Sequence, residues 1–277
     1  MSAAWLFITV SDESAASCAH LGALLATLER QDVAADLVLV MRGCDKPAAE
    51  ADRGLVRVHP VPSPLKISLS RARNLGLEHG RRVGLLQTCD QLAFPDDDAR
   101  YPDGLLERVG ALLHGETAVV CGSYAPNRDS LDRLRFPSTR NRLTPRMVMR
   151  VASSNNLFFR AEVVRAVGGF DERLGLGARY GASEDSDYVL RALALGFGGV
   201  YVPEALVEHP YKPGRADEYY RGNVAVLAKH ARTGGTALLL ARRLATGVVL
   251  TARSRLAATA YLRTLADAIA LGTGRAR

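Results

Sequence analysis

The stretch Phe94-Pro-Asp-Asp-Asp-Ala-Arg-Tyr-Pro102 places three consecutive carboxylates directly behind a short apolar run. Residues 92–94 are typical of the end of a buried strand, and Pro95 ends ladder hydrogen bonding. Open α/β sheets bind their ligands at the carboxyl ends of the strands. We therefore expect the side chains of Asp96, Asp97 and Asp98 to project into a ligand site.

Two interpretations of these acids are open from spacing alone. Neighbouring carboxylates repel one another, and a divalent cation such as Mg²⁺ or Mn²⁺ would compensate them while keeping positions for waters or phosphates. The alternative is an acidic turn before a helix that carries Asp103 in its first turn, near the positive end of the helix dipole.

The bulk composition is that of a globular protein. The 277 residues are 48% hydrophobic and 23% charged, and this length suits one large domain or a domain with an appendage. The four cysteines (18, 44, 89 and 121) are far apart, which favours reduced, mostly buried thiols. No basic leader and no uninterrupted apolar run of roughly 20 residues is found. We expect a cytoplasmic protein, either soluble or peripheral at the inner face of the membrane.

The net charge of +7 is concentrated near the C-terminus. Residues 221–277 hold ten basic residues and one acid, Asp267, whereas residues 1–220 carry a net charge of −2. We therefore divide the chain into a domain at 1–220 and a basic, amphipathic helical tail at 221–277. The tail either lies on an anionic membrane surface or packs against the domain or a second copy in a homodimer. Nucleic acid is not expected, since only Tyr261 follows Tyr220 as an aromatic residue for base stacking.

Strand and helix patterns alternate through the first domain. Trp5–Val10 and Asp36–Met41 read as buried strands, followed by a helix from Ser70. Met147–Val151 is predicted as a strand, and Ser183–Arg191 has the features of a helix start capped by Ser183. This alternation indicates a doubly wound α/β sheet.

Four elements then occur in a fixed order. Ser70-Arg-Ala-Arg-Asn74 begins a helix, the acids at 96–98 follow a strand, Gly168-Gly-Phe-Asp-Glu172 precedes Glu184-Asp-Ser-Asp187, and His209 lies beyond the last strand. Over residues 4–210 this order resembles family 2 of the nucleotide-sugar-dependent glycosyltransferases, the inverting group with the GT-A fold. The resemblance implies a Rossmann-like, doubly wound mixed sheet with helices on both faces, to which the C-terminal helical tail is added.

The resemblance also implies a function: metal-dependent, inverting transfer of a sugar from a nucleotide-sugar donor to a glycan or lipid-linked glycan, as in polysaccharide biosynthesis. The DXD motif falls on Asp96 and Asp98, and these two acids with His209 are the expected ligands of Mn²⁺ or Mg²⁺. Asp96 and Asp97 are also expected to face the donor. A structural role for His209 is an open alternative.

The remaining site residues are likewise implied by the resemblance. Asp185 is expected to be the catalytic base, with Glu184 binding a sugar; the alternative is that both acids only stabilise a helix N-terminus. Arg73 and Asn74 are expected beside the donor, although Arg73 pairing with the acid triplet is equally compatible. Thr9 and Ser11 from the first strand complete the expected donor-binding set.

The chain departs from the family pattern after the second strand. Residues 41–45 read Met-Arg-Gly-Cys-Asp where an acidic pair commonly contacts the nucleotide base, so the base is left open. This departure motivates an alternative function, a non-catalytic GT-A-like module that binds a nucleotide or glycan. Nucleotidyl transfer ranks last, because residues 11–14 are acidic where a triphosphate would need a basic loop.

Overall fold

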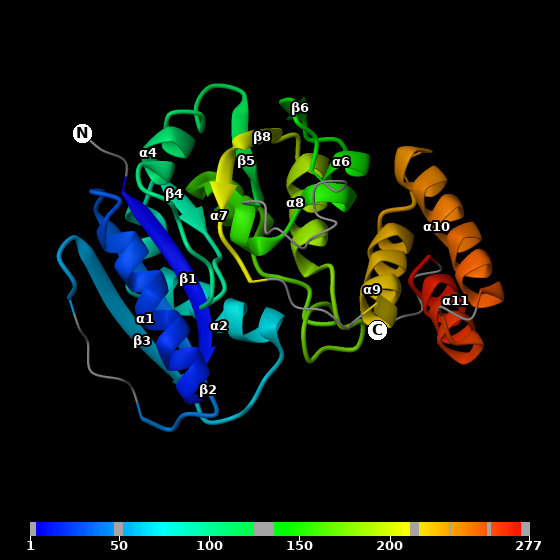
Figure 1. Ribbon diagram of the computed structural model, residues 1–277, viewed down its shortest axis with the longest axis horizontal. Coiled ribbons are helices and arrows are strands. Elements are labelled where there is room, and N and C mark those ends of the chain that lie inside the picture. The colour runs from blue at the N-terminus through cyan, green and yellow to red at the C-terminus, as the bar shows by residue number, and fades with distance from the viewer. Residues whose placement is uncertain are drawn as a thin grey trace.

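The computed structural model describes residues 4–46, 52–124, 136–210, 216–232, 234–253 and 256–272. Its centre is a mixed eight-stranded sheet with the order β3-β2-β1-β4-β7-β5-β8-β6 (Figure 1). Strands β1 to β4 pair in parallel, β7 runs antiparallel to both of its neighbours, and β5 pairs in parallel with β8. The strands are β1 (Trp5–Asp12), β2 (Ala35–Arg42), β3 (Val56–Ser63), β4 (Gln91–Ala93), β5 (Thr117–Tyr124), β6 (Asn141–Arg142), β7 (Leu157–Arg160) and β8 (Gly198–Val207).

Helices cover both faces of the sheet, and a helical group extends from one end (Figure 1). The expected α/β fold class is confirmed. The helices are α1 (Ala15–Glu29), α2 (Leu69–Arg82), α3 (Leu85–Thr88), α4 (Leu105–Gly110), α6 (Pro145–Val151), the 3₁₀ turn η1 (Ser154–Asn156), α7 (Ala161–Val167), α8 (Glu184–Ala194), α9 (Ala216–Lys229), α10 (Gly234–Ala252) and α11 (Ala258–Gly272).

The first strand shows how the sequence builds two cores. Successive side chains of a strand point to opposite faces of its sheet. Trp5 and Phe7 accordingly join the buried leucines of α1 in one cluster, whereas Leu6 and Ile8 join the cluster that includes α7 and α8. An uninterrupted apolar run therefore serves a strand that is covered on both faces.

One predicted element is wrong. Residues 147–151 form the last part of helix α6 and not a strand. The Thr144 hydroxyl accepts a hydrogen bond from the Met147 N–H, and Pro145 occupies the first turn, which are the features of a helix start. A short apolar run fits either period, so the capping residues decide the structure here.

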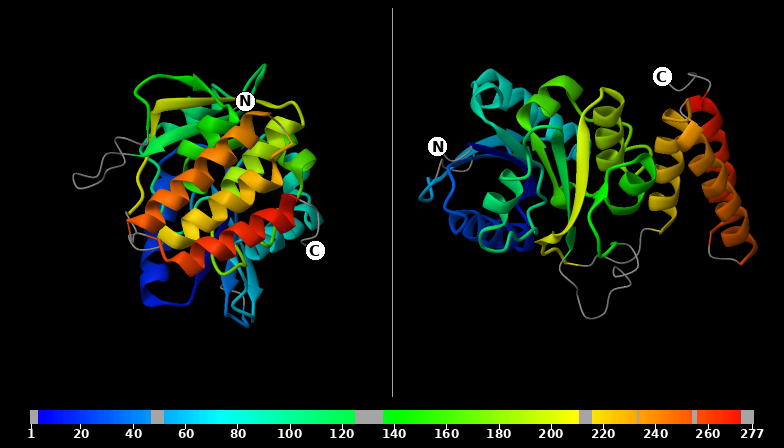
Figure 2. Two further views of the ribbon diagram at one scale, coloured as in Figure 1. Left: turned by 90° about the vertical axis from the view of Figure 1, so that its right-hand side faces the viewer. Right: turned by 90° about the horizontal axis from the view of Figure 1, so that it is seen from above.

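The C-terminal helices form a layer beyond the sheet. Figure 2 shows α9, α10 and α11 side by side at the end of the molecule away from β1, with α9 nearest the domain. The boundary expected at residue 220 falls inside α9. Asp267, on α11, pairs with Arg221 of α9 at 2.7 Å and with Arg179 of the domain at 3.2 Å. The single acid of the basic tail thus fastens α11 to both.

Within the described residues, α10 is the one helix long and apolar enough to cross a membrane by length and composition. The stretch Gly235–Ala252 has a mean hydropathy of 1.3, and 11% of it is buried. Arg242 and Arg243 lie near its middle, where charges are costly in a bilayer.

A buried ion cluster joins α9 to α8. The Asp187 side chain is fully buried and lies 2.9 Å from Arg191, 2.8 Å from Lys229 and 2.9 Å from His230. Burial alone would raise the pKa of Asp187, but its hydrogen bond to His230 and the charges of Lys229 and Arg191 bring that pKa below its usual value. Lys229 also pairs with Asp171 at 2.8 Å, so the start of the tail is held by domain acids.

Replacement of Asp187 by alanine should lower the free energy of unfolding by about 3 kcal/mol, because it leaves the partly buried Arg191 and Lys229 side chains without their shared, fully buried counter-charge. Denaturant unfolding measures this loss, with the exposed acid change Asp217→Ala as the matched control. Equal stabilities of the two variants would show that the cluster contributes nothing to holding α9.

Candidate active site

Two isolated β-bridges position the acidic loop after β4. Asp96 bridges Val10 of β1 in parallel, and Arg100 bridges Glu208 in antiparallel fashion. The second bridge has a hydrogen bond in each direction, at 2.8 and 3.0 Å. It fastens the residues just after β8 to the acidic loop, so that His209 lies opposite that loop.

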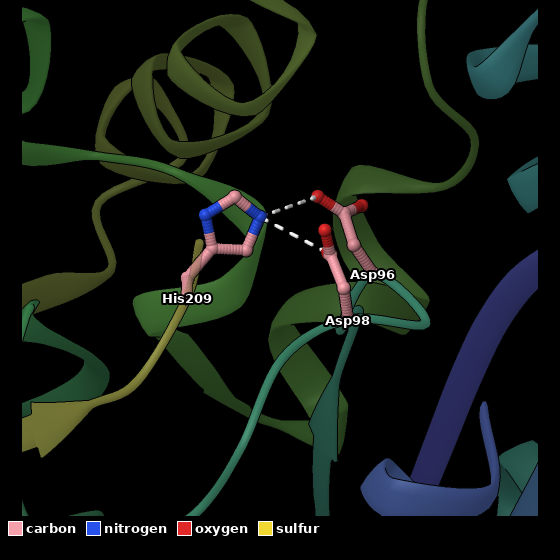
Figure 3. A group of neighbouring side chains, drawn as sticks. All are labelled: Asp96, Asp98 and His209. Atoms are coloured by element: carbon pink, nitrogen blue, oxygen red, sulfur yellow. Dashed lines mark ion pairs between the residues drawn. The ribbon is translucent and has the colours of Figure 1, made fainter. Parts of the chain in front are cut away.

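Figure 3 shows the imidazole of His209 facing the carboxylates of Asp96 and Asp98. Its Nε2 atom is 3.1 Å from Asp98 Oδ1 and 3.8 Å from Asp96 Oδ2. The Tyr124 ring stacks on the imidazole with a centroid distance of 5.7 Å, which fixes the plane of that ring. Asp98 is completely buried.

These three residues fit a divalent cation. One ligand atom from each lies within 4.8 Å of the other two, close enough to share one ion. A buried carboxylate such as Asp98 is costly unless it is paired or coordinates a metal, and two carboxylates with one imidazole form a donor set suited to Mn²⁺.

Arg73 connects the Asp96–Asp98–His209 cluster to a second acidic group, which consists of Glu184 and Asp185. Its side chain is 1% exposed, and Nη2 lies 3.0 Å from Asp96 Oδ1 while Nη1 lies 3.0 Å from Asp185 Oδ1 and 3.4 Å from Glu184 Oε1. Burial would lower the pKa of Arg73, but the three acids raise it, so the guanidinium stays charged. The residues predicted from separate parts of the chain are thus brought together around one cation.

The two acids at the start of α8, Glu184 and Asp185, have raised pKa values. Burial, reinforced by the charge of Asp185, raises the pKa of Glu184 to about 8, although Arg73 opposes this shift. Burial also raises the pKa of Asp185, while Arg73 and the backbone N–H of Ser154 oppose it. A raised carboxyl pKa suits a group that accepts a proton during a reaction near neutral pH.

The entry to α8 is strained. Ser183, immediately before these acids, has φ of 72°, which is uncommon for a residue other than glycine. Its side chain makes no capping hydrogen bond, so the predicted Ser cap is wrong. Gly175, at φ of +93°, lies so close to Glu184 that an added Cβ would be 3.0 Å from the carboxyl carbon. Strained backbone of this kind clusters at functional sites.

Asn74 and the Gly168–Glu172 segment hold the Arg73 side chain in position. Asn74 accepts a hydrogen bond from the Phe170 N–H at 2.7 Å and donates to the Phe170 carbonyl at 3.0 Å. The Phe170 ring lies under the Arg73 guanidinium at 5.3 Å and against Phe94 at 4.9 Å. Asn74 thus fixes the ring on which Arg73 rests.

The predicted first-strand residues lie on the other side of the acidic loop. Ser11 donates a hydrogen bond of 2.8 Å to Asp97, so that acid faces β1 and not His209. Thr9 is fully buried, and its hydroxyl makes no hydrogen bond within the described part of the chain.

Sequence reasoning missed Asn155. This residue is 1% exposed; its Oδ1 accepts from the Asp96 N–H at 2.6 Å and its Nδ2 donates to Asp96 Oδ2 at 3.0 Å. It therefore orients Asp96 toward Arg73 and His209. The signal was the polar run Ser153-Ser-Asn-Asn156 between two apolar segments.

Comparisons with known proteins support the fold. No family model matches the sequence, and neither does any curated protein. Among solved structures, the chain is similar to S. aureus TarS 1–349, with a TM-score of 0.67, 13% identity, and coverage of 98% of this chain and 81% of that one. The same protein in complex with UDP-GlcNAc gives a TM-score of 0.66 at 13% identity, covering 99% and 82%.

A third similar structure is the mannosyltransferase PcManGT from Pyrobaculum calidifontis in complex with GDP-Man and Mn²⁺. Its TM-score is 0.57 at 17% identity, and the match covers 96% of this chain and 86% of that chain. At these identities the similarity establishes the shared GT-A fold.

Mn²⁺ should raise the melting temperature of the wild-type protein, because an ion that binds only the folded state stabilises it. Asp98→Ala and His209→Ala should each weaken Mn²⁺ binding by at least about tenfold, the loss found even for outer-shell changes. Asp97→Asn is the control, since Asp97 bonds to Ser11 and lies outside the cluster. An unchanged Mn²⁺ response in both alanine variants would rule out this site.

The Glu184→Gln variant should lose less stability than wild type as the pH rises. The folded protein keeps the Glu184 proton from the ordinary value of 4.5 up to a pKa of about 8, so it binds more protons than the unfolded chain in that window and its stability falls with pH. Glutamine has no such proton. Melting curves across the window measure the difference, and parallel curves would contradict a raised pKa.

Proposed function

We propose that the protein is a glycosyltransferase that takes a nucleotide-sugar donor and transfers the sugar, with inversion, to a hydroxyl of a glycan or lipid-linked glycan. The observation that carries this proposal is Arg73, which bridges Asp96 of the candidate metal group and Asp185 of the candidate base group. Solved structures of the same fold that are complexed with UDP-GlcNAc, and with GDP-Man and Mn²⁺, support a donor of this class.

In the proposed reaction Asp185 accepts the proton of the acceptor hydroxyl. The hydroxyl oxygen then forms a bond to the anomeric carbon, and the bond from that carbon to the donor diphosphate breaks with its electron pair on the phosphate oxygen. Arg73 holds the Asp185 carboxylate at 3.0 Å, which fixes the orientation of that carboxylate. Glu184, one residue earlier in the strained turn, is proposed to bind a sugar hydroxyl.

Asp96, Asp98 and His209 are the residues proposed to hold Mn²⁺ or Mg²⁺. Such an ion, when bound, supplies positive charge to the departing diphosphate. Asp97, held by Ser11 at 2.8 Å, is proposed to face the donor ribose together with the first strand.

The nucleotide base of the donor can be identified by a thermal-shift screen of UDP, GDP, ADP, CDP and dTDP with Mn²⁺, because stabilisation follows occupancy. The nucleotide with the largest shift then identifies the sugar donors to test for transfer. Tight nucleotide binding with no turnover on any donor would instead support a binding module.

The Asp185→Asn variant should lose at least about 100-fold in turnover, the lower range for loss of a general base. Its affinity for the nucleoside diphosphate should stay close to wild type, since asparagine is isosteric and Arg73 keeps Asp96 and Glu184. Turnover and diphosphate binding are measured on the same preparations, with Asp217→Asn as the surface control. Parallel loss of binding and turnover would assign Asp185 a structural role.

A further inference from the structure

A pocket of about 320 Å³ lies between α6, α9 and α10, among residues that the proposed reaction does not use. It lies where the domain meets the C-terminal layer. Its lining comprises Arg146, Met149, Arg150, Asn223, Leu227, Leu239, Arg242, Arg243 and Thr246. Four of these nine described residues are arginines and none is acidic, so the lining carries the charge that an anion would require.

Two of the pocket arginines, Arg146 and Arg242, differ in their surroundings from arginines elsewhere in the protein. Arg73, Arg191 and Arg221 each face a carboxylate within 3.0 Å. Arg242 and Arg146, by contrast, make no ion pair within the part of the chain that the structure describes, and both are exposed. An arginine fork recognises phosphate oxygens two at a time.

Arg243 adds a partly buried donor. Its guanidinium lies over the Tyr220 ring at 5.1 Å, and its buried Nε makes no hydrogen bond within the described residues. The ring fixes the direction of the guanidinium, because Tyr220 is itself bonded to the Arg243 carbonyl at 3.1 Å. The pocket thus has one pre-oriented guanidinium, that of Arg243, beside the exposed guanidinium groups of Arg146 and Arg242.

Helix α10 presents three different sides. Leu239, Arg242, Arg243 and Thr246 recur at helical spacing and line the pocket. Gly247 packs so closely on the aromatic residues of α9 and α11 that an added Cβ would lie 2.0 Å from the Tyr220 hydroxyl. On the third side, next to the pocket face by helical geometry, Leu238 is 72% exposed and Val249 is 49% exposed.

We propose that this pocket binds the phosphate head of an anionic amphiphile, with its hydrocarbon part against the exposed apolar side of α10. A free phosphate ion would use the arginines and leave Met149, Leu227 and Leu239 unused. A phosphate headgroup attached to hydrocarbon chains would match both the arginines and the apolar side chains, as happens for helices that lie at a membrane interface. A bilayer phospholipid and a lipid-phosphate carrier share this chemistry.

Vesicle flotation of the full chain tests the proposal, with phosphatidylcholine vesicles that contain or lack phosphatidic acid. Arg146→Gln/Arg242→Gln should weaken binding to phosphatidic acid vesicles about 25-fold, at roughly fivefold for each arginine near an anionic surface. Both side chains are exposed, so the protein should fold normally. Arg253→Gln/Arg263→Gln removes the same charge outside the pocket and should lose fivefold or less. Equal losses in the two variants, or no loss in either, would overturn the proposal.

Soluble probes distinguish the sources of phosphate. Short-chain phosphatidic acid, below the concentration at which it forms micelles, should displace the wild-type protein from vesicles far better than inorganic phosphate. Equal displacement would leave a simple phosphate site and overturn the lipid assignment. A polyprenyl phosphate that competes better than phosphatidic acid would identify the carrier as the source. These experiments measure lipid binding and not sugar transfer, so a negative result would overturn the lipid proposal without bearing on the proposed glycosyltransferase activity.

Discussion

The buried guanidinium of Arg73 is the interaction on which the site depends. One cation serves three carboxylates from the loop after β4 and the start of α8, so the fully ionised group would carry excess negative charge in a buried place. Two adjustments relieve that excess. A raised pKa lets Glu184 keep a proton up to about 8, and a cation beside Asp96 would supply charge from the other side. The raised pKa of Glu184 and the proposed metal binding by Asp96, Asp98 and His209 would therefore be two responses to one electrostatic constraint.

Much of this arrangement was predictable from the sequence because strand ends impose it. Asp96 follows a buried strand and His209 follows the last long one, and α/β topology brings such positions to one edge of the sheet. The ordered motifs then predicted that Asp185 would join them. Arg73 contacts both Asp96 and Asp185, and His209 contacts Asp96, which agrees with the predicted grouping, while the catalytic and metal roles stay predictions.

Other features were out of reach because their signals are short or non-local. Residues 147–151 fit a strand or a helix by hydrophobic pattern, and the Thr144-Pro145 start decided for a helix. Asn155 contacts an acid 59 positions earlier in the chain, and no local pattern encodes such a pairing. The antiparallel β7 has four residues, too few for the period of alternation to reveal its direction. The division of the chain at residue 220 rests on net charge alone and stays a prediction, because net charge describes the surface of a segment and not what its buried side contacts.

The cations of the C-terminal layer have two kinds of surroundings. Lys229 and Arg221 are neutralised by acids, and they hold α9 and α11 to the domain. Arg242 and Arg243 face α6, which contributes two further arginines to the same pocket. That helix ends at Val151, shortly before Asn155, which holds Asp96. A rigid seven-residue helix thus carries pocket arginines and leads directly into the residue that orients the candidate metal ligand. Acids thus pair with Lys229 and Arg221 where α9 and α11 meet the domain, whereas the arginines that line the pocket are the ones proposed to bind a ligand.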